Sequence, residues 1–304
     1  MYFTFFCINM FQHLVLSGGA IVGFAYFGTI QTLIEHNLLN IDDIQTIHAT
    51  SIGTLLAVCF TLGYELDVLK TYLIDRPWKD LYKIDFHSIV RAIKHGGMFD
   101  RIELLKTIEP LLLGKDLSVD ISLIEFYNYN HKEIHFYTTE YSELQLVDIS
   151  FKTHPTWKLI DAIFASCCLP VLFIPLFLEE KYYIDGAIVM NYPLQCCLDQ
   201  GHDINTILGL TTKSAEVESP KSKPYRSSSS YKLLDYVISI SMKFWSTIKH
   251  ERTDAEKNVP NQIYVTCPSD PWTIFKAFDS KEERLRLYNT GVDSALTFLK
   301  ACPQ

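Results

Sequence analysis

The order of the first segments constrains the fold of this chain more than any other feature. Residues 13–16 form a short apolar run that ends at a Ser-Gly-Gly turn, and apolar residues then recur at helical spacing over 23–36. A second apolar run, 44–48, ends at a turn that contains a serine, and an apolar segment long enough for a buried helix follows over 54–62. A strand–turn–helix order that occurs twice favours a parallel sheet with helices on both faces. We therefore predict an α/β fold, a three-layer α/β/α domain with a mainly parallel sheet.

The rest of the chain continues this alternation. Residues 64–132 are predicted to be mostly helical and to cover one side of a site, with the clearest helix at 101–113 and its apolar side formed by Ile102, Leu105, Ile108, Leu111 and Leu112. Further elements are expected as strands at 134–138, 144–149, 181–184, 204–210 and 263–266, and as helices at 157–166, 231–251 and 281–300. The polar, serine-rich stretch 213–230 is predicted to be a flexible loop. No internal repeat is visible. The last hundred residues are expected to add strands and helices to the same domain.

Composition excludes several classes of protein. The chain has 304 residues, of which 48% are hydrophobic and 20% charged, with a formal net charge of -8. An acidic chain has no general attraction to nucleic acid or to anionic lipid, so contact with a membrane would need a local basic patch such as the lysines and arginine at Lys221, Lys223, Arg226 and Lys232. This stretch could be a mobile lid that contacts the lipid interface, together with Trp245 on the helix that follows. The simpler hypothesis is a solvated loop followed by a helix that packs on the core.

The eight cysteines have neither disulfide-scaffold nor zinc-ligand spacing, which predicts reduced thiols in a cytoplasmic compartment. No apolar run reaches the roughly 18 residues that a membrane-spanning helix needs. The apolar start of the chain lacks a preceding Lys or Arg, so we expect no signal peptide and a dispensable extension over residues 1–9.

Ser51 is the first candidate for chemistry. It lies in Ala49-Thr50-Ser51-Ile52-Gly53, between a strand and a buried helix. A nucleophile on such a sharp turn projects above the sheet, and the helix directs its N-terminal N–H groups at the same spot. The alternative is an ordinary serine that caps the helix.

The glycine turn that begins at Ser17 is the second candidate, because backbone N–H groups without side chains can approach an anion closely. A phosphate-binding loop of the Walker type needs Lys where Phe24 stands, and a dinucleotide loop needs Gly where Ala20 stands, so a nucleotide-binding module is weakly supported. The oxyanion of an acyl-transfer intermediate remains, beside the alternative of a turn needed only for packing.

The third candidate is Asp185, which follows an apolar strand and precedes Gly186-Ala187. A carboxylate there could accept the proton of Ser51 as a general base. Taken alone, an Asp-Gly pair is more often a simple turn.

Together these three features resemble the patatin-like phospholipase family. That family has a glycine-rich loop after its first strand, a GxSxG nucleophile turn and a later DGG or DGA motif, and it uses a Ser–Asp dyad without a catalytic histidine. The resemblance extends over 13–200 and includes 165–170, Pro175 and 191–193. It implies a catalytic region at 13–200, with 201–304 as a C-terminal extension packed on the same domain. It also implies roles for single residues: Ser51 and Asp185 as catalytic residues, Gly18, Gly19 and Ala20 as the oxyanion hole, and Gly23, Gly53 and Gly186 as supports of the motifs.

Three positions depart from the family pattern. Ala20 and Ala49 stand where the family usually has glycine, and both are expected to be tolerated if φ stays below zero there. Val22 stands where the family usually has Lys or Arg, which removes a positive charge beside the loop. Val22 and Ala49 keep open an alternative: a catalytically weakened relative that binds lipid or a protein partner.

The resemblance implies hydrolysis of the carboxylic esters of phospholipids or related acyl lipids, with no cofactor, no metal and no nucleic acid. The protein is expected in the cytoplasm, with transient contact at membrane surfaces. A rival enzyme class, the α/β-hydrolases with a Ser–Asp–His triad, would need a histidine after the acid, and His202 and His250 are available.

Overall fold

The sheet is the centre of the molecule. The computed structural model describes residues 11–214, 236, 240, 253–267 and 272–301. Eight strands form one sheet in the order β10-β9-β1-β2-β4-β8-β7, and β5 pairs with β4 beside this path. Five neighbouring strands are parallel, namely β10 (Gln262–Cys267), β9 (Ile207–Ser214), β1 (His13–Leu16), β2 (Thr46–Thr50) and β4 (Glu133–Glu140). The antiparallel additions are β5 (Gln145–Ile149), β7 (Leu176–Leu178) and β8 (Lys181–Asp185).

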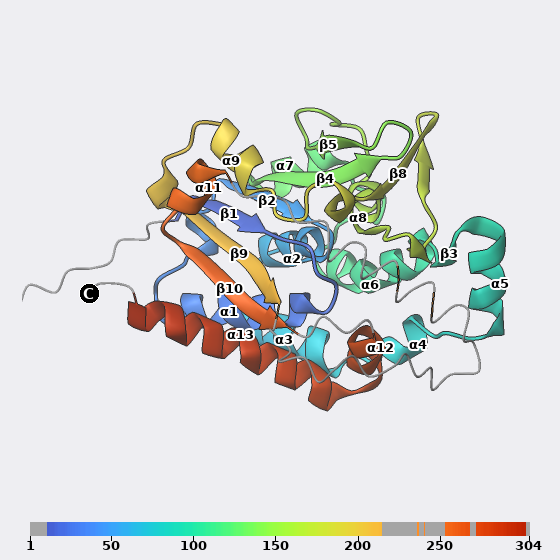
Figure 1. The fold of residues 1–304 in the computed structure, drawn as a ribbon, viewed down its shortest axis with the longest axis horizontal. Coiled ribbons are helices and arrows are strands. Elements are labelled where there is room, and N and C mark those ends of the chain that lie inside the picture. Colours follow the sequence, from blue (N-terminus) through green and yellow to red (C-terminus); the bar gives the residue numbers. More distant parts are fainter. Residues whose placement is uncertain (1–10, 215–235, 237–239, 241–252, 268–271, 302–304) are drawn as a thin grey trace, which may run out of the picture.

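Helices cover both faces of this sheet (Figure 1). The larger apolar core joins the sheet to α1 (Val22–Glu35), α2 (Ile52–Thr61), α3 (Leu66–Asp75) and α13 (Lys281–Ala301). A smaller cluster lies on the opposite face, where Val15 of β1 and Ile207 of β9 pack with residues of α9 (Leu194–Asp199) and with Val259, which follows α11 (Asp254–Asn258). The strand β1 is buried along its whole length, as expected of a central parallel strand. The predicted three-layer α/β/α fold with a mainly parallel sheet is therefore confirmed.

The segment predicted to be mostly helical contains α3 and four further helices: α4 (Trp78–Leu81), α5 (Phe86–His95), α6 (Arg101–Leu113) and α7 (Leu123–Asn130). The bounds of α6 agree with the prediction, but the prediction of which residues form its apolar side was partly wrong. Ile102 is 55% exposed, whereas Leu104 is buried and faces the core with Ile108 and Leu111. The apolar face is rotated because α6 packs on α8 (Leu159–Cys167), which the spacing of its own residues cannot reveal.

The sequence-based prediction missed the short strands. The strands β3 (Gly97–Phe99) and β6 (Val171–Phe173) pair with each other in a separate two-stranded sheet. Each has three residues, too few for an alternating pattern to be recognised. The expected strand 204–210 also begins late, because Asp203 caps a 3-10 turn over Ile204–Thr206 before β9 starts. A further helix, α12 (Trp272–Asp279), precedes α13 in the chain and lies beside it.

Several predictions fall outside the described part of the chain. They concern the dispensable residues 1–9, most of the loop 213–230, the basic stretch from Lys221 to Lys232, and most of the helix 231–251 with Trp245. The loop prediction was wrong at its first two residues, because Lys213 and Ser214 end β9.

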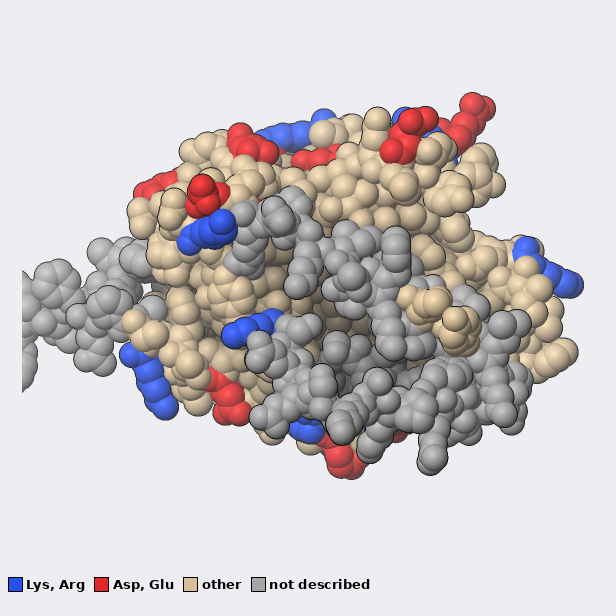
Figure 2. Space-filling view, viewed as in Figure 1, with Lys and Arg blue, Asp and Glu red and all other residues tan. Residues whose placement is uncertain are grey.

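The described part of the chain also shows the distribution of surface charges, the state of the cysteines and the character of the helices. On the described part of the face in Figure 2, acidic and basic side chains are interspersed. The six cysteines among the described residues are free thiols, five of them buried. Among the helices of the described part, none combines the length and the apolar character needed to cross a membrane.

Candidate active site

Ser51 lies on a strained turn at the carboxyl end of β2. Its φ of 53° and ψ of -128° are unusual for a residue with a side chain, and α2 begins at the next residue. Backbone held in such a conformation is typical of functional positions. The strain turns the chain sharply from strand to helix and lifts the hydroxyl above the sheet, as a nucleophile requires.

The three supporting glycines lie where other residues come too close for a side chain. A Cβ at Gly53 would lie 2.7 Å from the carbonyl oxygen of Leu16, and one at Gly23 would lie 2.5 Å from Cγ1 of Ile52. A Cβ at Gly186 would overlap the carbonyl oxygen of Tyr137. These contacts hold β1, the glycine loop and the end of β8 tightly against the Ser51 turn.

Asp185 lies at the end of β8, beside Ser51. The Ser51 hydroxyl donates a hydrogen bond of 2.7 Å to Oδ2 of Asp185, and the Ala187 N–H donates one of 2.8 Å to Oδ1. The carboxyl group is 1% exposed, and its burial raises the pKa of Asp185 to about 6 in spite of both hydrogen bonds. A carboxylate with such a pKa is ionised near neutral pH and is basic enough to accept a proton.

Ser166, from α8, holds the backbone of the turn and was not singled out from the sequence. Its hydroxyl accepts a 2.9 Å hydrogen bond from the Ser51 N–H and donates one of 2.5 Å to the carbonyl oxygen of Tyr137 on β4. The side chain is fully buried. The stretch 165–170 had been noted only as part of the family resemblance, and a serine inside an apolar helix was the one local signal for this role.

The glycine loop differs from expectation at two positions. The Gly18 N–H donates a 3.0 Å hydrogen bond to the carbonyl oxygen of Asn191, so it already has an acceptor. The N–H groups of Gly19 and Ala20 have no acceptor among the described residues. Ala20 has a φ of 50°, so the condition that φ stays below zero is not met there, although it is met at Ala49 within β2. Val22 begins α1 with its side chain fully buried.

An apolar cavity of about 460 Å³ opens at Ser51 and Asp185. Its lining includes the glycine loop and many large apolar side chains, among them Leu55, Trp78, Phe99, Leu104, Phe173 and Phe278. Several of these come from the segment 64–132, which therefore covers one side of the site as predicted. A cavity of this kind is suited to a hydrocarbon chain that ends at a reactive carbonyl.

No histidine among the described residues bonds to Ser51 or Asp185 or lines the cavity. His202 lies on the turn after α9, where its ring stacks on His13. His250 lies outside the described residues. Within the described part of the chain, Ser51 and Asp185 are therefore hydrogen-bonded to each other, and no histidine joins them as the third member of a triad.

The chain is similar in sequence and in fold to several known proteins. The sequence profile of the family described as patatin-like phospholipase matches residues 14–197. An uncharacterized protein, R571 of Acanthamoeba polyphaga mimivirus, is 24% identical over 203 residues, which are 67% of this chain and 66% of that protein. The probable lipid hydrolase 463L of Invertebrate iridescent virus 6 is 23% identical over 198 residues, 62% of this chain and 63% of that protein.

The matches thus span just under two thirds of the length of these two relatives. Among solved structures, VipD from Legionella pneumophila superposes with a TM-score of 0.56 at 16% identity, covering 96% of this chain and 67% of that one. At this identity the likeness concerns the fold. The profile match covers more than half of the chain and includes the glycine loop, the Ser51 turn and Asp185, and the chain therefore belongs to the patatin-like phospholipase family.

Proposed function

We propose that this protein hydrolyses carboxylic ester bonds of phospholipids or related acyl lipids, with Ser51 as nucleophile and Asp185 as general base. The observation that carries the proposal is the 2.7 Å hydrogen bond from the Ser51 hydroxyl to the buried Asp185 carboxylate, beside an apolar cavity. The viral relative named as a probable lipid hydrolase supports the choice of substrate class.

The reaction begins when Ser51 Oγ attacks the ester carbonyl carbon and its proton passes to Asp185 Oδ2. The resulting oxyanion is stabilised by the N–H groups of Gly19 and Ala20, with Gly18 as a contributor if its bond to Asn191 opens. Collapse of this intermediate expels the alcohol, which takes the proton from Asp185. Water, activated by the same carboxylate, then releases the fatty acid and restores the serine.

These steps use only groups of this chain, so we expect no calcium requirement. A calcium-selective chelator should leave the hydrolysis rate unchanged, and loss of activity that added calcium restores would contradict the mechanism.

The decisive experiment is labelling with a fluorophosphonate, which reacts with activated serines. The unmodified protein should be labelled and should release fatty acid from phospholipid vesicles, whereas Ser51→Ala and Asp185→Asn should do neither. Ser142→Ala, in the exposed turn after β4, is the matched control and should behave like the unmodified protein. A folded protein that is not labelled, or a Ser51→Ala variant that is, would sink the proposal.

A catalytically weakened lipid-binding protein is the second candidate, and the left-handed φ of 50° at Ala20 favours it. A side chain in this region costs roughly 1–2 kcal/mol, which glycine avoids. Under this alternative the loop is poorly adapted to catalysis, and Ala20→Gly should raise the labelling rate of a nearly inert protein. An unmodified protein that already labels fast, with no gain in Ala20→Gly, would exclude it.

Transient membrane contact is proposed for α5. Phe86 and Ile93 on this helix are 68% and 80% exposed, and the exposed Lys83 and Lys94 lie beside them in the sequence. Apolar side chains with flanking lysines suit an anionic lipid surface. The helix lies between the cavity-lining residues Tyr82 and Phe99 and projects from the body of the molecule (Figure 1). A cytoplasmic location stays a prediction from the free thiols.

A further inference from the structure

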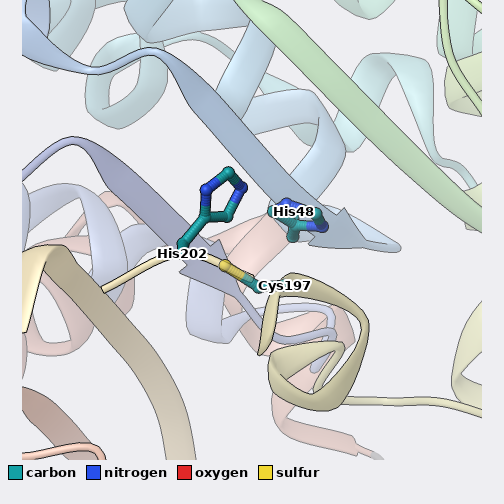
Figure 3. Close-up of side chains that lie close together, drawn as sticks. All are labelled: His48, Cys197 and His202. Carbon is teal, nitrogen blue, oxygen red and sulfur yellow. The ribbon is translucent and has the colours of Figure 1, made fainter. Parts of the chain in front are cut away.

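A cluster of nitrogen and sulfur ligands lies apart from the active-site cavity. His48 comes from β2, Cys197 from α9 and His202 from the turn after α9. One ligand atom from each of the three residues lies within 4.8 Å of the other two, and Figure 3 shows the sulfur of Cys197 and the two imidazoles gathered together. None of the three lines the cavity beside Ser51.

The face of the sheet explains this separation. Side chains alternate along β2, so Ile47 and Ala49 belong to the larger core while His48 points to the other face. Cys197 belongs to the smaller cluster on that face, where α9 packs on β1 and β2. The three residues therefore form a site of their own, on the side of the sheet away from α1 and α2.

His48 carries a second, independent sign of a missing ligand. Its Nδ1 shares a 2.8 Å hydrogen bond with the hydroxyl of Tyr137. Among the described residues no group makes a well-aligned hydrogen bond to its buried Nε2, although the side chain of Gln200 lies near enough to interact with the ring. A buried polar atom without a partner costs about 1–3 kcal/mol. Metal-bound histidines commonly hold their second nitrogen in such a hydrogen bond, which fixes the ring.

We propose that His48, Cys197 and His202 bind a Zn²⁺ ion. Two imidazoles and one thiolate form a ligand set that zinc prefers, and a water molecule would complete a tetrahedron. Bonds of about 2.0 Å to nitrogen and 2.3 Å to sulfur need the ligand atoms to approach by about 1 Å. His202 is only half-buried on a turn, and Cys197 belongs to a helix of six residues, so small adjustments can supply this movement.

The surroundings tolerate the charge. Binding releases the proton of the Cys197 thiol, so the ion and its ligands carry one net positive charge. The ring of His135 stacks on His48 with centroids 4.4 Å apart, and its two nitrogens lie 2.8 Å from a carboxylate oxygen of Asp148 and 3.2 Å from one of Glu133. Two carboxylates therefore lie beside the ring that covers His48, and their negative charge favours a cation at this site.

A zinc ion here would tie α9 to β2 close to the active site. His48 is three residues before Ser51 on the same strand, and the segment that leads into α9 contains Asn191, whose carbonyl accepts the Gly18 N–H. The ion would act as a structural anchor for both the nucleophile strand and the glycine loop.

The test uses the full chain, purified without chelators and then dialysed against Zn²⁺ or Co²⁺. We expect about one metal ion per chain. The cobalt protein should show the thiolate-to-metal absorption and the intense visible bands of a tetrahedral site with sulfur. This measurement needs no variant, and the absence of these bands at saturating cobalt would overturn the proposal.

The variants assign the ligands. Cys197→Ser and His202→Ala should each lower the affinity for zinc by at least about tenfold. Cys197→Ser should also remove the thiolate-to-metal absorption band of the cobalt protein. Cys196→Ser, at the neighbouring cysteine, is the matched control and should keep both the stoichiometry and the spectrum. Zinc should also raise the melting temperature of the unmodified protein but not that of Cys197→Ser. Metal that survives both ligand variants unchanged would refute this site, whatever the outcome of serine labelling.

Discussion

At the scale of single residues, the burial of Asp185 affects both the proposed chemistry and the stability of the folded protein. Its carboxylate is fully enclosed and accepts only the Ser51 hydroxyl and the Ala187 N–H among the described residues. Burial outweighs these bonds and raises the pKa of Asp185 from 3.8 to about 6. The enclosure that makes the group a competent base also makes its charged form costly to the folded protein.

The first prediction concerns pH and activity. A general base must be ionised, so kcat/KM should fall as the pH drops through about 6, where Asp185 becomes protonated. The logarithm of kcat/KM for a soluble ester should then decrease by one unit per pH unit on the acid side. A profile that stays flat down to pH 4.5 would exclude Asp185 as the base.

The second prediction concerns pH and stability. Because the folded pKa of Asp185 lies above its unfolded value, the stability linked to this group is fully present below about pH 4 and is lost as the pH rises through 6. Asp185→Asn removes this loss, so the variant should be more stable than the unmodified protein at pH 7.5, by up to about 3 kcal/mol. Urea denaturation at pH 7.5 and pH 4 measures the difference, which should shrink at the lower pH. If Asp185→Asn and the unmodified protein were equally stable at pH 7.5 as well as at pH 4, burial would not destabilise the ionised carboxylate.

At the scale of elements, α8 fastens the turn at Ser51 to the sheet. Its Ser166 hydroxyl connects the Ser51 N–H with the Tyr137 carbonyl, so helix, turn and β4 share one hydrogen-bond chain. Ser166 is thus a positioning residue, which acts on the reaction through the nucleophile.

The third prediction follows for Ser166→Ala. The variant leaves the Ser51 N–H without its acceptor, which should destabilise the protein by about 1–3 kcal/mol and slow labelling of Ser51. We expect kcat to fall more than KM rises, because the nucleophile is displaced while the cavity is intact. Ser166→Thr keeps the hydroxyl and should recover part of the labelling rate. A variant that loses stability but labels at the normal rate would show a purely structural role.

The fourth prediction concerns α5. Phe86→Ser and Ile93→Ser together should reduce binding to anionic phospholipid vesicles at least about tenfold, since each change removes roughly 1.5–3 kcal/mol of apolar burial in the membrane. Hydrolysis of a soluble ester should stay unchanged. Ile204→Ser, at a residue 38% exposed in the 3-10 turn before β9, is the control for lost surface hydrophobicity. Sedimentation with vesicles measures the binding, and equal binding of all three proteins would remove α5 from the interface.

At the scale of the whole molecule, the C-terminal part contributes to the same sheet and core as the rest. The strands β9 and β10 extend the sheet next to β1, and α13 packs along α1 (Figure 1). The two helices approach closely where Gly291 meets the carbonyl of Ala25, and the Thr29 hydroxyl donates a 3.0 Å hydrogen bond to the Gly291 carbonyl. We therefore propose that 13–200 and 201–304 form one cooperative unit.

The fifth prediction tests this unit. Gly291→Ala places a methyl group against the Ala25 carbonyl, which should destabilise the protein by about 2–3 kcal/mol. Gly201→Ala is the control: its φ of 79° adds strain, but no atom lies within 4 Å of the new methyl group, so the loss should stay near 1 kcal/mol. Denaturation followed by fluorescence and by circular dichroism should give one coincident transition in every case. Two separate transitions would show that the C-terminal part folds independently.

The sequence by itself determined what neighbouring residues encode. The order of short apolar runs and helical spacing predicted β1, α1, β2, α2 and the bounds of α6. The glycine loop and the turn at Ser51 were visible because each needs particular residues next to one another in the chain. Strands of three residues and the rotation of α6 were not, because a pattern so short, or a helix face set by a partner, has no local signal.

Only the tertiary structure decided which of these residues meet. Ser51 and Asp185 are 134 positions apart, and their hydrogen bond depends on β8 joining the sheet antiparallel to β4. The same holds for the Gly18 bond to Asn191 and for the gathering of His48, Cys197 and His202, which have no metal-ligand spacing in the sequence. Such contacts arise from the packing of the whole chain. The free energy that brings distant segments together comes from all the buried surfaces, so no single segment of the sequence determines it.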